Sequence, residues 1–277
     1  MLAAAVLLAG CGETAKPGGP TTSSAVPRAH TEGLSIELAV PGTLAGDFAA
    51  LQQNFAGRSG MTMMAVGGQS VLSFGDWTTG PAWSTMKIPL AVAALRNSNA
   101  YNAIASTAIT ASDNGAADTL WQSLGTADQA AAAVEAVLRE GGDARTTVPT
   151  TRTRADASIF GQADWSLADQ VRFAAALPCL PRTERVIGLM GQIQPSHRWG
   201  LGAFASAEFK GGWGPDPAGK YLVRQFGLID TPSGRVAVAF AAQPDSGQFN
   251  DGMVQLDKMT KLLSAHLADL VGGQCPA

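Results

Sequence analysis

Residues 84–87 read Ser84-Thr85-Met86-Lys87, and this S-x-x-K stretch opens a set of three short motifs. Ser112-Asp113-Asn114 follows it, and Lys210-Gly211-Gly212 closes the set. An S-x-x-K stretch is expected by chance about once in a chain of this length, whereas S-D-N placed before a K-[T/S/G]-G is far rarer. The ordered set therefore predicts an acyl-transfer site in which a serine nucleophile, a base and a proton relay come from separate segments.

Ser84 and Lys87 lie three residues apart on a predicted helix, so both side chains face the same way. The positive end of the helix would lie at Ser84, and a partly buried Lys87 with a lowered pKa would take the serine proton. When the S-x-x-K stretch is considered without the other two motifs, the alternative is that Ser84 caps the helix and Lys87 lies on the surface one turn later. Ser112-Asp113-Asn114 has an alternative too, as the cap of a helix beginning near Ala116, and the two interpretations are compatible.

The composition is that of a globular protein, with 277 residues, 46% of them hydrophobic and 15% charged. A net charge of −3 gives no basic excess for nucleic acid. His30, His197 and His266 are isolated from one another and from acidic or Cys ligands, and no G-x-S-x-G stretch is present. We therefore expect no metal, no cofactor and no histidine-based triad.

Residues 1–11 are apolar and end in Leu8-Ala9-Gly10-Cys11, which resembles a bacterial lipoprotein signal with Cys11 as the lipidated residue. The apolar stretch is short and no Lys or Arg precedes it, so we expect the true start codon to lie upstream. An ordinary apolar N-terminus with an incidental Cys is the alternative. Residues 12–34 are rich in Gly, Pro, Ser and Thr and predict a flexible linker. Together these segments predict an exported protein anchored through lipid to the outer face of the cytoplasmic membrane.

Two cysteines remain, Cys179 and Cys275. In an oxidising compartment they would form one disulfide that ties the C-terminal segment to the helical region. Two buried free thiols are the alternative.

Hydrophobic periodicity divides the rest of the chain into two β-rich parts around a helical part. Helices are predicted over 44–55, 84–95, 116–124, 127–139, 166–177 and 251–270. Strands are predicted over 61–66, 70–74, 204–213, 221–229 and 236–241, with a long turn-rich loop over 141–164. The order predicts an α+β fold: a five-stranded antiparallel sheet flanked by helices, with strands from both chain ends, plus an all-α lobe.

Residues 44–270 resemble the class A β-lactamase and penicillin-binding serine transpeptidase superfamily, above all over 107–124, TAITASDNGAADTLWQSL. The resemblance implies a monomer with one such domain over 35–277. Its α/β part would comprise 44–97 and 202–271, and its helical lobe 98–201. It implies that the chain attacks cyclic amide bonds of β-lactams or stem peptides of peptidoglycan.

The resemblance also implies a role for each motif residue. Ser84 would be the nucleophile and Lys87 its base or proton shuttle. Ser112 would pass a proton to the departing nitrogen, and Asn114 would hold the substrate amide carbonyl. Lys210 would supply positive charge for the substrate carboxylate.

The third motif departs from the family pattern. Gly211 stands where the family has Thr or Ser, so a hydroxyl that contacts the substrate carboxylate is missing. Arg224 on the next strand is expected to replace part of that contact, with an exposed arginine of no role as the alternative. Gly211 and Gly212 would let substrate come close. The backbone N–H groups of Ser84 and Trp213 would be the oxyanion donors.

A second departure concerns the water that would release the acyl group. The family places a Glu on the loop after S-D-N, but residues 146–152, TTVPTTR, contain no acidic residue. Asp156 and Asp164 lie further along the loop and are candidates to point into the site, with surface loop carboxylates as the alternative. Only 28 residues separate Ser84 from Ser112 (112 − 84), which is short for the family and predicts an open cleft.

Three functions remain open from the sequence. The first is a serine hydrolase that attacks β-lactams at Ser84, with slow deacylation. The second is a D-alanyl-D-alanine peptidase acting on peptidoglycan. The third is a catalytically inactive envelope lipoprotein that keeps the fold for binding.

Overall fold

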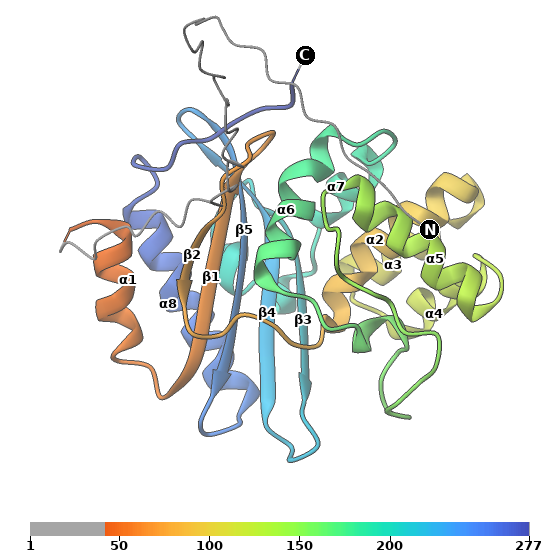
Figure 1. Cartoon of the computed structure of the whole chain (residues 1–277), viewed down its shortest axis with the longest axis horizontal. Coiled ribbons are helices and arrows are strands. Elements are labelled where there is room, and N and C mark those ends of the chain that lie inside the picture. The colour runs from red at the N-terminus through yellow and green to blue at the C-terminus, as the bar shows by residue number, and fades with distance from the viewer. Residues whose placement is uncertain (1–41, 277) are drawn as a thin grey trace, which may run out of the picture. The chain divides into compact units, whose positions relative to one another are not determined.

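The structure is a computed structural model that describes residues 42–276. The predictions for Cys11 and for the linker over 12–34 lie outside the described residues. Figure 1 shows helices on both sides of a central sheet. The helices are α1 (Leu44–Gln52), α2 (Lys87–Asn97), α3 (Asn102–Thr110), α4 (Asn114–Gln122), α5 (Ala127–Glu140), α6 (Leu167–Ala176), α7 (Glu184–Met190) and α8 (Phe249–Ala265). The strands are β1 (Gly57–Ala65), β2 (Leu72–Gly75), β3 (Glu208–Pro215), β4 (Tyr221–Thr231) and β5 (Gly234–Pro244).

The sheet has five antiparallel strands in the order β2-β1-β5-β4-β3. Strands from the N-terminal and C-terminal parts of the chain pair at the centre of the sheet, where β1 lies next to β5. Their register runs from Gly57 opposite Pro244 to Ala65 opposite Val236. The predicted α+β class and the five-stranded antiparallel sheet are therefore confirmed. Because β4 and β5 are covered on both faces, eight consecutive residues of β4 are buried, from Leu222 to Ile229.

Helices cover the two faces of the sheet unequally. Helix α6 packs against β1, β4 and β5, whereas α8 packs against β4 and β5 and contacts α1 (Figure 1). Helices α2, α3, α4 and α5 pack on one another as the helical lobe. Helix α6 lies within 98–201, the range predicted as the lobe, but it contacts the sheet. Helix α2 lies within the range predicted as the α/β part, but it contacts α3, α4 and α5. The domain bounds themselves stay a prediction. Periodicity identifies a buried helix face but does not say which element covers it.

The third strand begins later than predicted. A 3-10 turn at Gly200–Ala203 precedes it, with Gly200 at φ +58°, and β3 starts at Glu208. Leu201 N and Gly200 N are held by the side chains of Gln225 and Asp257. The residues from Phe204 to Ala207 form a further turn, closed by a hydrogen bond from Ala207 N to Phe204 O at 3.2 Å, in place of the predicted start of the strand.

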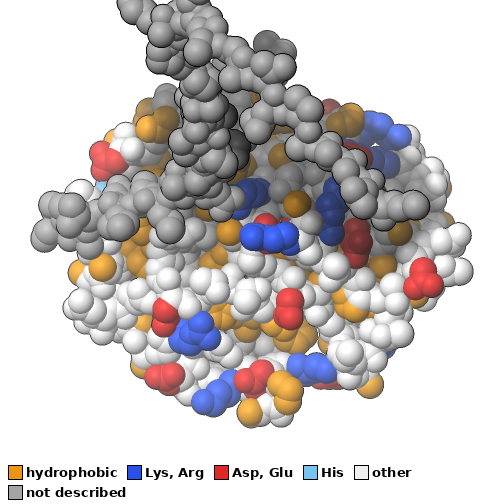
Figure 2. Space-filling view, in the orientation of Figure 1, with side chains coloured by type: hydrophobic (Ala, Val, Ile, Leu, Met, Phe, Trp, Pro, Cys, Tyr) orange, Lys and Arg blue, Asp and Glu red, His pale blue; other side chains and the backbone are white. Residues whose placement is uncertain are grey.

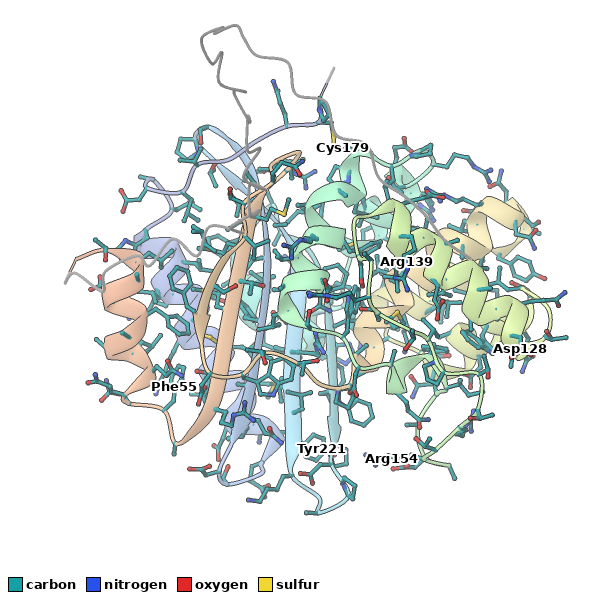
Figure 3. The ribbon with its side chains drawn as sticks, viewed as in Figure 1. Phe55, Asp128, Arg139, Arg154, Cys179 and Tyr221 are labelled. Carbon is teal, nitrogen blue, oxygen red and sulfur yellow. A yellow bond between two sulfur atoms is a disulfide. The ribbon has the colours of Figure 1, made fainter. Side chains whose placement is uncertain are left out.

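Cys179 and Cys275 form a disulfide, with their Cα atoms 5.3 Å apart. Cys179 lies at the end of the molecule opposite Tyr221 and Arg154 (Figure 3). Within residues 42–276, no helix has the length and apolar character needed to cross a membrane. On the described part of the face in Figure 2, basic and acidic side chains are interspersed, so that part offers no extended basic surface.

Candidate active site

Ser84 lies in a tight turn between the sheet and the helical lobe. A 3-10 turn at Trp83–Met86 carries it, and α2 begins directly afterwards at Lys87. Trp83 has φ +49°, a conformation that costs a non-glycine residue about 1–3 kcal/mol and that is found mostly at functional sites. Thr85 Oγ1 donates to Ala82 O at 2.5 Å, and a buried hydrogen bond from α6 to Thr85 Oγ1 fixes the turn further.

Lys87 is fully buried and its ammonium reaches the second motif. Its Nζ lies 2.8 Å from Asn114 Oδ1, 2.5 Å from Ser112 O and 3.2 Å from Asp113 O. Burial lowers the pKa of Lys87 from 10.5 to about 7, although the charges of Asp113 and Asp118 oppose this change. Near neutral pH the amine is therefore populated in both its charged and its neutral form, as a base in an acyl transfer requires.

Ser112 lies between two lysines. Lys210 Nζ donates to Ser112 Oγ at 2.9 Å, and Lys87 Nζ lies 3.5 Å from the same oxygen. Ser112 has φ +57°, so its hydroxyl is placed by a left-handed backbone conformation. Asp113 caps α4, with Asp113 Oδ1 accepting from Ala116 N at 2.6 Å. The S-D-N motif thus both caps a helix and positions a hydroxyl, as the two sequence interpretations allow.

Lys210 is almost completely buried, with 2% of its surface exposed. Burial lowers its pKa well below 10.5, and the nearby charge of Lys87 lowers it further. Its Nζ also donates to Gly211 O at 2.7 Å. Lys210 therefore gives up a proton more readily than an exposed lysine, which favours exchange with Ser112.

The glycines of the third motif make room for the protein's own atoms. A Cβ on Gly212 would lie 2.9 Å from both Ser84 N and Ala82 O, so only glycine lets β3 approach the nucleophile turn this closely. A Cβ on Gly211 would lie 3.2 Å from Cη2 of Trp199. The space beside Gly211, which a family Thr or Ser would occupy, is thus filled by Trp199. The role of both glycines in admitting substrate stays a prediction.

Arg224 lies in the interior of the protein and does not line the cleft. The side chain is fully buried, and its guanidinium donates to Gln170 Oε1 at 2.8 Å and to Trp165 O at 3.0 Å. It also donates to Gly80 O at 2.9 Å and Pro81 O at 3.1 Å. Arg224 faces α6 and the segment before Ser84 because it is paired with Gly212 across the sheet and shares its face.

A cleft of about 190 Å³ opens beside Ser84. Lys87 and Asn114 line one wall, and Trp213 lines the strand wall. The remaining wall is the loop after α5, and the full lining is Trp83, Ser84, Lys87, Asn114, Arg154, Asp156, Ala157, Ser158, Phe160, Gly161, Trp213, Gly214, Pro215 and Tyr221. Trp213 and Asp156 were both candidates for the site from the sequence, whereas the contribution of the other residues of 154–161 was not anticipated.

Asp156 supplies the carboxylate that lines this cleft, but it is already paired. Arg154 Nη2 lies 2.7 Å from Asp156 Oδ2, and the carboxylate is two-thirds exposed. The hydrogen bond from Arg154 lowers the pKa of Asp156. Asp164, the other candidate, forms a β-bridge with Pro81 and does not line the cleft. Neither acid is placed as a strong base toward water at Ser84.

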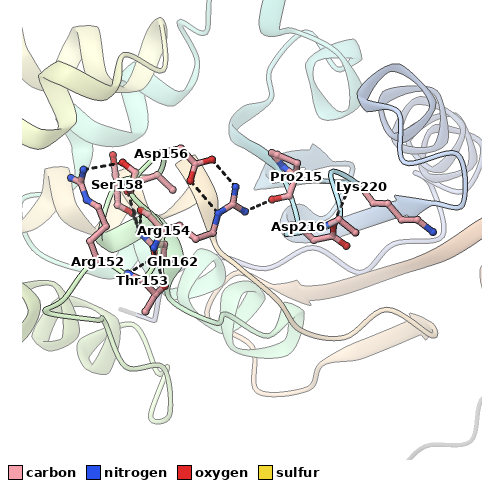
Figure 4. Close-up of polar contacts among 12 residues, drawn as sticks. Arg152, Thr153, Arg154, Asp156, Ser158, Gln162, Pro215, Asp216 and Lys220 are labelled. Carbon is pink, nitrogen blue, oxygen red and sulfur yellow. Dashed lines mark hydrogen bonds and ion pairs between the residues drawn. The ribbon is translucent and has the colours of Figure 1, made fainter.

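The loop is held by one glutamine and one arginine (Figure 4). Gln162 Oε1 accepts from Thr153 N at 3.0 Å and from Arg154 N at 2.9 Å, and Gln162 Nε2 donates to Ala157 O at 3.1 Å. Arg154 Nη1 donates across the cleft to Pro215 O at the end of β3. The arginine also lies 5.4 Å above the ring of Trp83. The two contacts of Arg154 with Pro215 and Trp83 join segments far apart in sequence, so no local pattern could have revealed them.

Solved structures that this chain resembles include class A β-lactamases. The extended-spectrum β-lactamase TLA-1 superposes with a TM-score of 0.67 at 14% identity, over 81% of this chain and 98% of that one. A class A β-lactamase from Mycobacterium abscessus gives 0.65 at 15% identity, over 80% and 98%. An ancestral class A β-lactamase gives 0.63 at 18% identity, over 80% and 99%.

The chain has the class A β-lactamase fold. Identities below 20% place the similarity at the level of the fold. A scan of the sequence against family models gives no match, and no curated protein matches it. Within the β-lactamase fold of this chain, the structure brings Ser84, Lys87, Ser112, Asn114 and Lys210 together. Among the described residues, no group of three or more His, Cys, Asp or Glu side chains is placed to hold a metal ion.

Proposed function

We propose that this chain is a serine acyl-transfer enzyme that β-lactams acylate at Ser84 and that releases the acyl group slowly. One observation carries the proposal. Lys87 is buried beside Ser84 with a pKa of about 7, and its Nζ is bonded to Asn114 in the same cleft. A lysine that packed only for stability would gain nothing from this loss of solvation.

Acylation would proceed by proton transfers among the motif residues. Neutral Lys87 takes the proton of Ser84 Oγ as that oxygen forms a bond to the lactam carbonyl carbon. Backbone N–H groups of Ser84 and Trp213 would stabilise the oxyanion. When the carbon–nitrogen bond breaks, Ser112 Oγ gives its proton to the nitrogen and is reprotonated by Lys210, whose Nζ lies 2.9 Å away.

Deacylation requires a second base that activates water. Asp156 lines the cleft, but its ion pair with Arg154 and its lowered pKa make it a poor acceptor. An acyl-enzyme at Ser84 would therefore accumulate. Accumulation is the expected behaviour of a weak β-lactamase.

The same paired Asp156 favours a second function, that of a D-alanyl-D-alanine peptidase. Acylation by a peptide that ends in D-alanyl-D-alanine uses the same Ser84, Lys87 and Ser112 steps. The acyl group then passes to water or to an amine, and penicillin is an inhibitor that deacylates slowly. Release of D-alanine from such a peptide would distinguish this function from that of a β-lactamase.

We also propose that the domain is exported and held at the outer face of the cytoplasmic membrane through lipid on Cys11. The disulfide between Cys179 and Cys275 supports an oxidising compartment. Residues 12–34 would act as the tether. Labelling of the full-length protein with radioactive palmitate in a bacterial host, with Cys11→Ala as control, tests the anchor.

Stopped-flow hydrolysis of a chromogenic cephalosporin tests the acyl-transfer proposal. The expected trace is a burst of about one equivalent per enzyme followed by slow steady turnover, because acylation outruns deacylation. Ser84→Ala should abolish both phases. Steady turnover without a burst would contradict slow deacylation. The absence of any reaction with the cephalosporin and with the peptide would leave the fold as a binding module.

A further inference from the structure

A second cavity lies at the end of the molecule opposite the cleft. Its volume is about 370 Å³, and none of the residues that line it lines the cleft. Cys179 lines this cavity, and Figure 3 shows Cys179 at the far end of the molecule from Arg154 and Tyr221, which line the cleft. The two spaces are therefore separate sites.

The wall of this cavity that Pro276 forms is held in place by the chain around it. The disulfide joins Cys275, the preceding residue, to Cys179 in the turn after α6. A Cβ on Gly67 would lie 2.4 Å from Gln274 O, so the turn after β1 lies directly against the same C-terminal segment. The cavity is thus formed by the fold and needs no rearrangement to accept a ligand.

Arg172 contributes hydrogen-bond donors that the protein does not use. It lies on α6, is partly exposed and lines the cavity. Its guanidinium makes no hydrogen bond or ion pair with the residues that the structure describes, whereas Arg145 binds Asp169 on the same helix. A guanidinium presents its N–H donors as a planar fork that matches the two oxygens of a carboxylate. The cavity therefore offers a free anion-binding group.

Negative charge around the cavity limits the charge of a ligand. Glu140 also lines it, with Glu140 Oε2 paired to Arg96 Nη1 at 2.6 Å. The cavity lies at the C-terminal ends of α5 and α6, where backbone carbonyls carry partial negative charge. These groups oppose a dianion such as a phosphate monoester, whereas Arg172 balances a single carboxylate.

We infer that this cavity binds a small carboxylic acid with an apolar body, and that Arg172 receives the carboxylate. The apolar body would pack on the side chains of Met64, Ala175, Ala176, Leu180 and Pro276. The volume suits about a dozen non-hydrogen atoms, since an apolar cavity of about 150 Å³ holds benzene. Burial of the body and a bidentate hydrogen bond to the carboxylate both contribute to affinity. This binding does not depend on acyl transfer at Ser84.

Three naphthalene compounds of similar size test the preference for a single carboxylate. The first, 2-naphthoate, carries the carboxylate, and 2-acetylnaphthalene replaces its charged oxygen with a methyl group. The third, 2-naphthyl phosphate, is mostly a dianion at about pH 7.5. Isothermal titration calorimetry at that pH gives the affinity and the number of sites. The parent should bind one equivalent of 2-naphthoate at least about tenfold more tightly than either of the others, because a hydrogen bond to a charged group is a strong one.

Arg172→Met removes the guanidinium and keeps an unbranched side chain that continues the apolar wall. Its affinity for 2-naphthoate should fall at least about tenfold, while that for 2-acetylnaphthalene should stay within about threefold of the parent. Arg185→Met is the matched control, because Arg185 is an exposed arginine on α7 that lines neither cavity. It should change neither affinity. Ala176→Trp places a large side chain in the cavity and should weaken both ligands at least about tenfold.

Each of three results would overturn the inference. The first is equal affinity of the parent for 2-naphthoate and 2-acetylnaphthalene, and the second is unchanged binding of 2-naphthoate in Arg172→Met or Ala176→Trp. The third is tighter binding of 2-naphthyl phosphate, which would assign the cavity to a phosphate ester instead of a carboxylate.

Ser84→Ala separates this inference from the proposed function. The variant should bind 2-naphthoate with the affinity of the parent, because Ser84 lines the cleft and not the second cavity. A loss of 2-naphthoate binding in Ser84→Ala would place the ligand in the cleft and overturn the inference. A parent that binds no 2-naphthoate would overturn it too and leave acylation of Ser84 unaffected.

Discussion

Lys210 Nζ donates to Ser112 Oγ at 2.9 Å, although 98 residues separate the two in the sequence. The contact joins the edge strand β3 to the helical lobe across the site. Lys87 Nζ approaches the same hydroxyl at 3.5 Å from the nucleophile side. One serine is therefore in reach of two buried lysines, both with lowered pKa values. This geometry makes Ser112 the natural carrier of a proton between the two sides of the site.

Ser112→Gly should separate activity from stability. Glycine adopts the φ of +57° at this position without the strain that serine bears, so the melting temperature should stay the same or rise. Loss of the hydroxyl should slow acylation by about 10²-fold or more. Thermal unfolding and the acylation rate with benzylpenicillin measure the two effects. An active variant would show that protons bypass Ser112.

Acylation should depend on pH through Lys87. The amine accepts the proton of Ser84 only when neutral, and its pKa is lowered to about 7. The rate should therefore rise with pH through about 7, and it should fall again at the higher pH at which Lys210 loses the proton that it passes to Ser112. Acylation rate constants measured from pH 5 to pH 9 test this profile. A rate independent of pH over that range would contradict the role of Lys87 as base.

Lys87→Arg is the control for the pH profile. Arginine keeps the positive charge but stays protonated at all these pH values, so it cannot serve as the base. The variant should lose most of the acylation rate, and any residual rate should show no inflection near pH 7. An unchanged inflection in Lys87→Arg would assign the titration to another group.

Asp156→Asn should leave deacylation almost unchanged. The carboxylate is paired with Arg154 and its pKa is lowered, so it contributes little as a base toward water. The lifetime of the penicillin adduct should stay within about twofold of the parent, because general base catalysis, where it operates, is worth about 10²-fold or more. Decay of the adduct mass over hours gives the lifetime. A much longer lifetime in Asp156→Asn would identify Asp156 as the deacylating base after all.

Removal of the disulfide should lower the free energy of unfolding without changing the acylation rate. Cys179 and Cys275 are separated by 96 residues, and loss of such a crosslink costs about 2–4 kcal/mol. The disulfide lies at the end of the molecule away from Arg154 and Tyr221, which line the cleft (Figure 3). Cys179→Ser/Cys275→Ser should unfold at a lower denaturant concentration yet keep the parent acylation rate. A large loss of rate would show that the two ends of the domain are coupled.

The sequence predicts the fold and the motif residues well because both depend on short-range patterns. Apolar runs bounded by glycine or proline mark the strands, and their order brings both chain ends into one sheet. The three motifs predict that Ser84, Lys87 and Ser112 lie together, since each motif fixes a local geometry. In the structure, Lys87 and Lys210 both reach Ser112.

Short-range sequence patterns do not predict how side chains from distant segments pack against one another. Arg224 on a strand looks the same in sequence whether it faces solvent or the interior, and only its pairing with Gly212 fixes the face. From the sequence, Gly211 indicates only that a hydroxyl is missing. The structure shows that Trp199 packs against this glycine. The hydrogen bond from Arg154 to Pro215 joins residues that are 61 apart in the sequence. Its acceptor is a backbone carbonyl, which every residue has, so the identity of residue 215 gives no sign of it.

Intact mass of the protein after incubation with benzylpenicillin shows directly whether a β-lactam acylates Ser84. Ser84→Ala serves as the control, and peptide mapping locates the adduct. We expect a lasting gain equal to the mass of one penicillin on the parent, on the peptide that contains Ser84, and no gain on Ser84→Ala. An unmodified parent that also leaves the penicillin intact would contradict acyl transfer at Ser84.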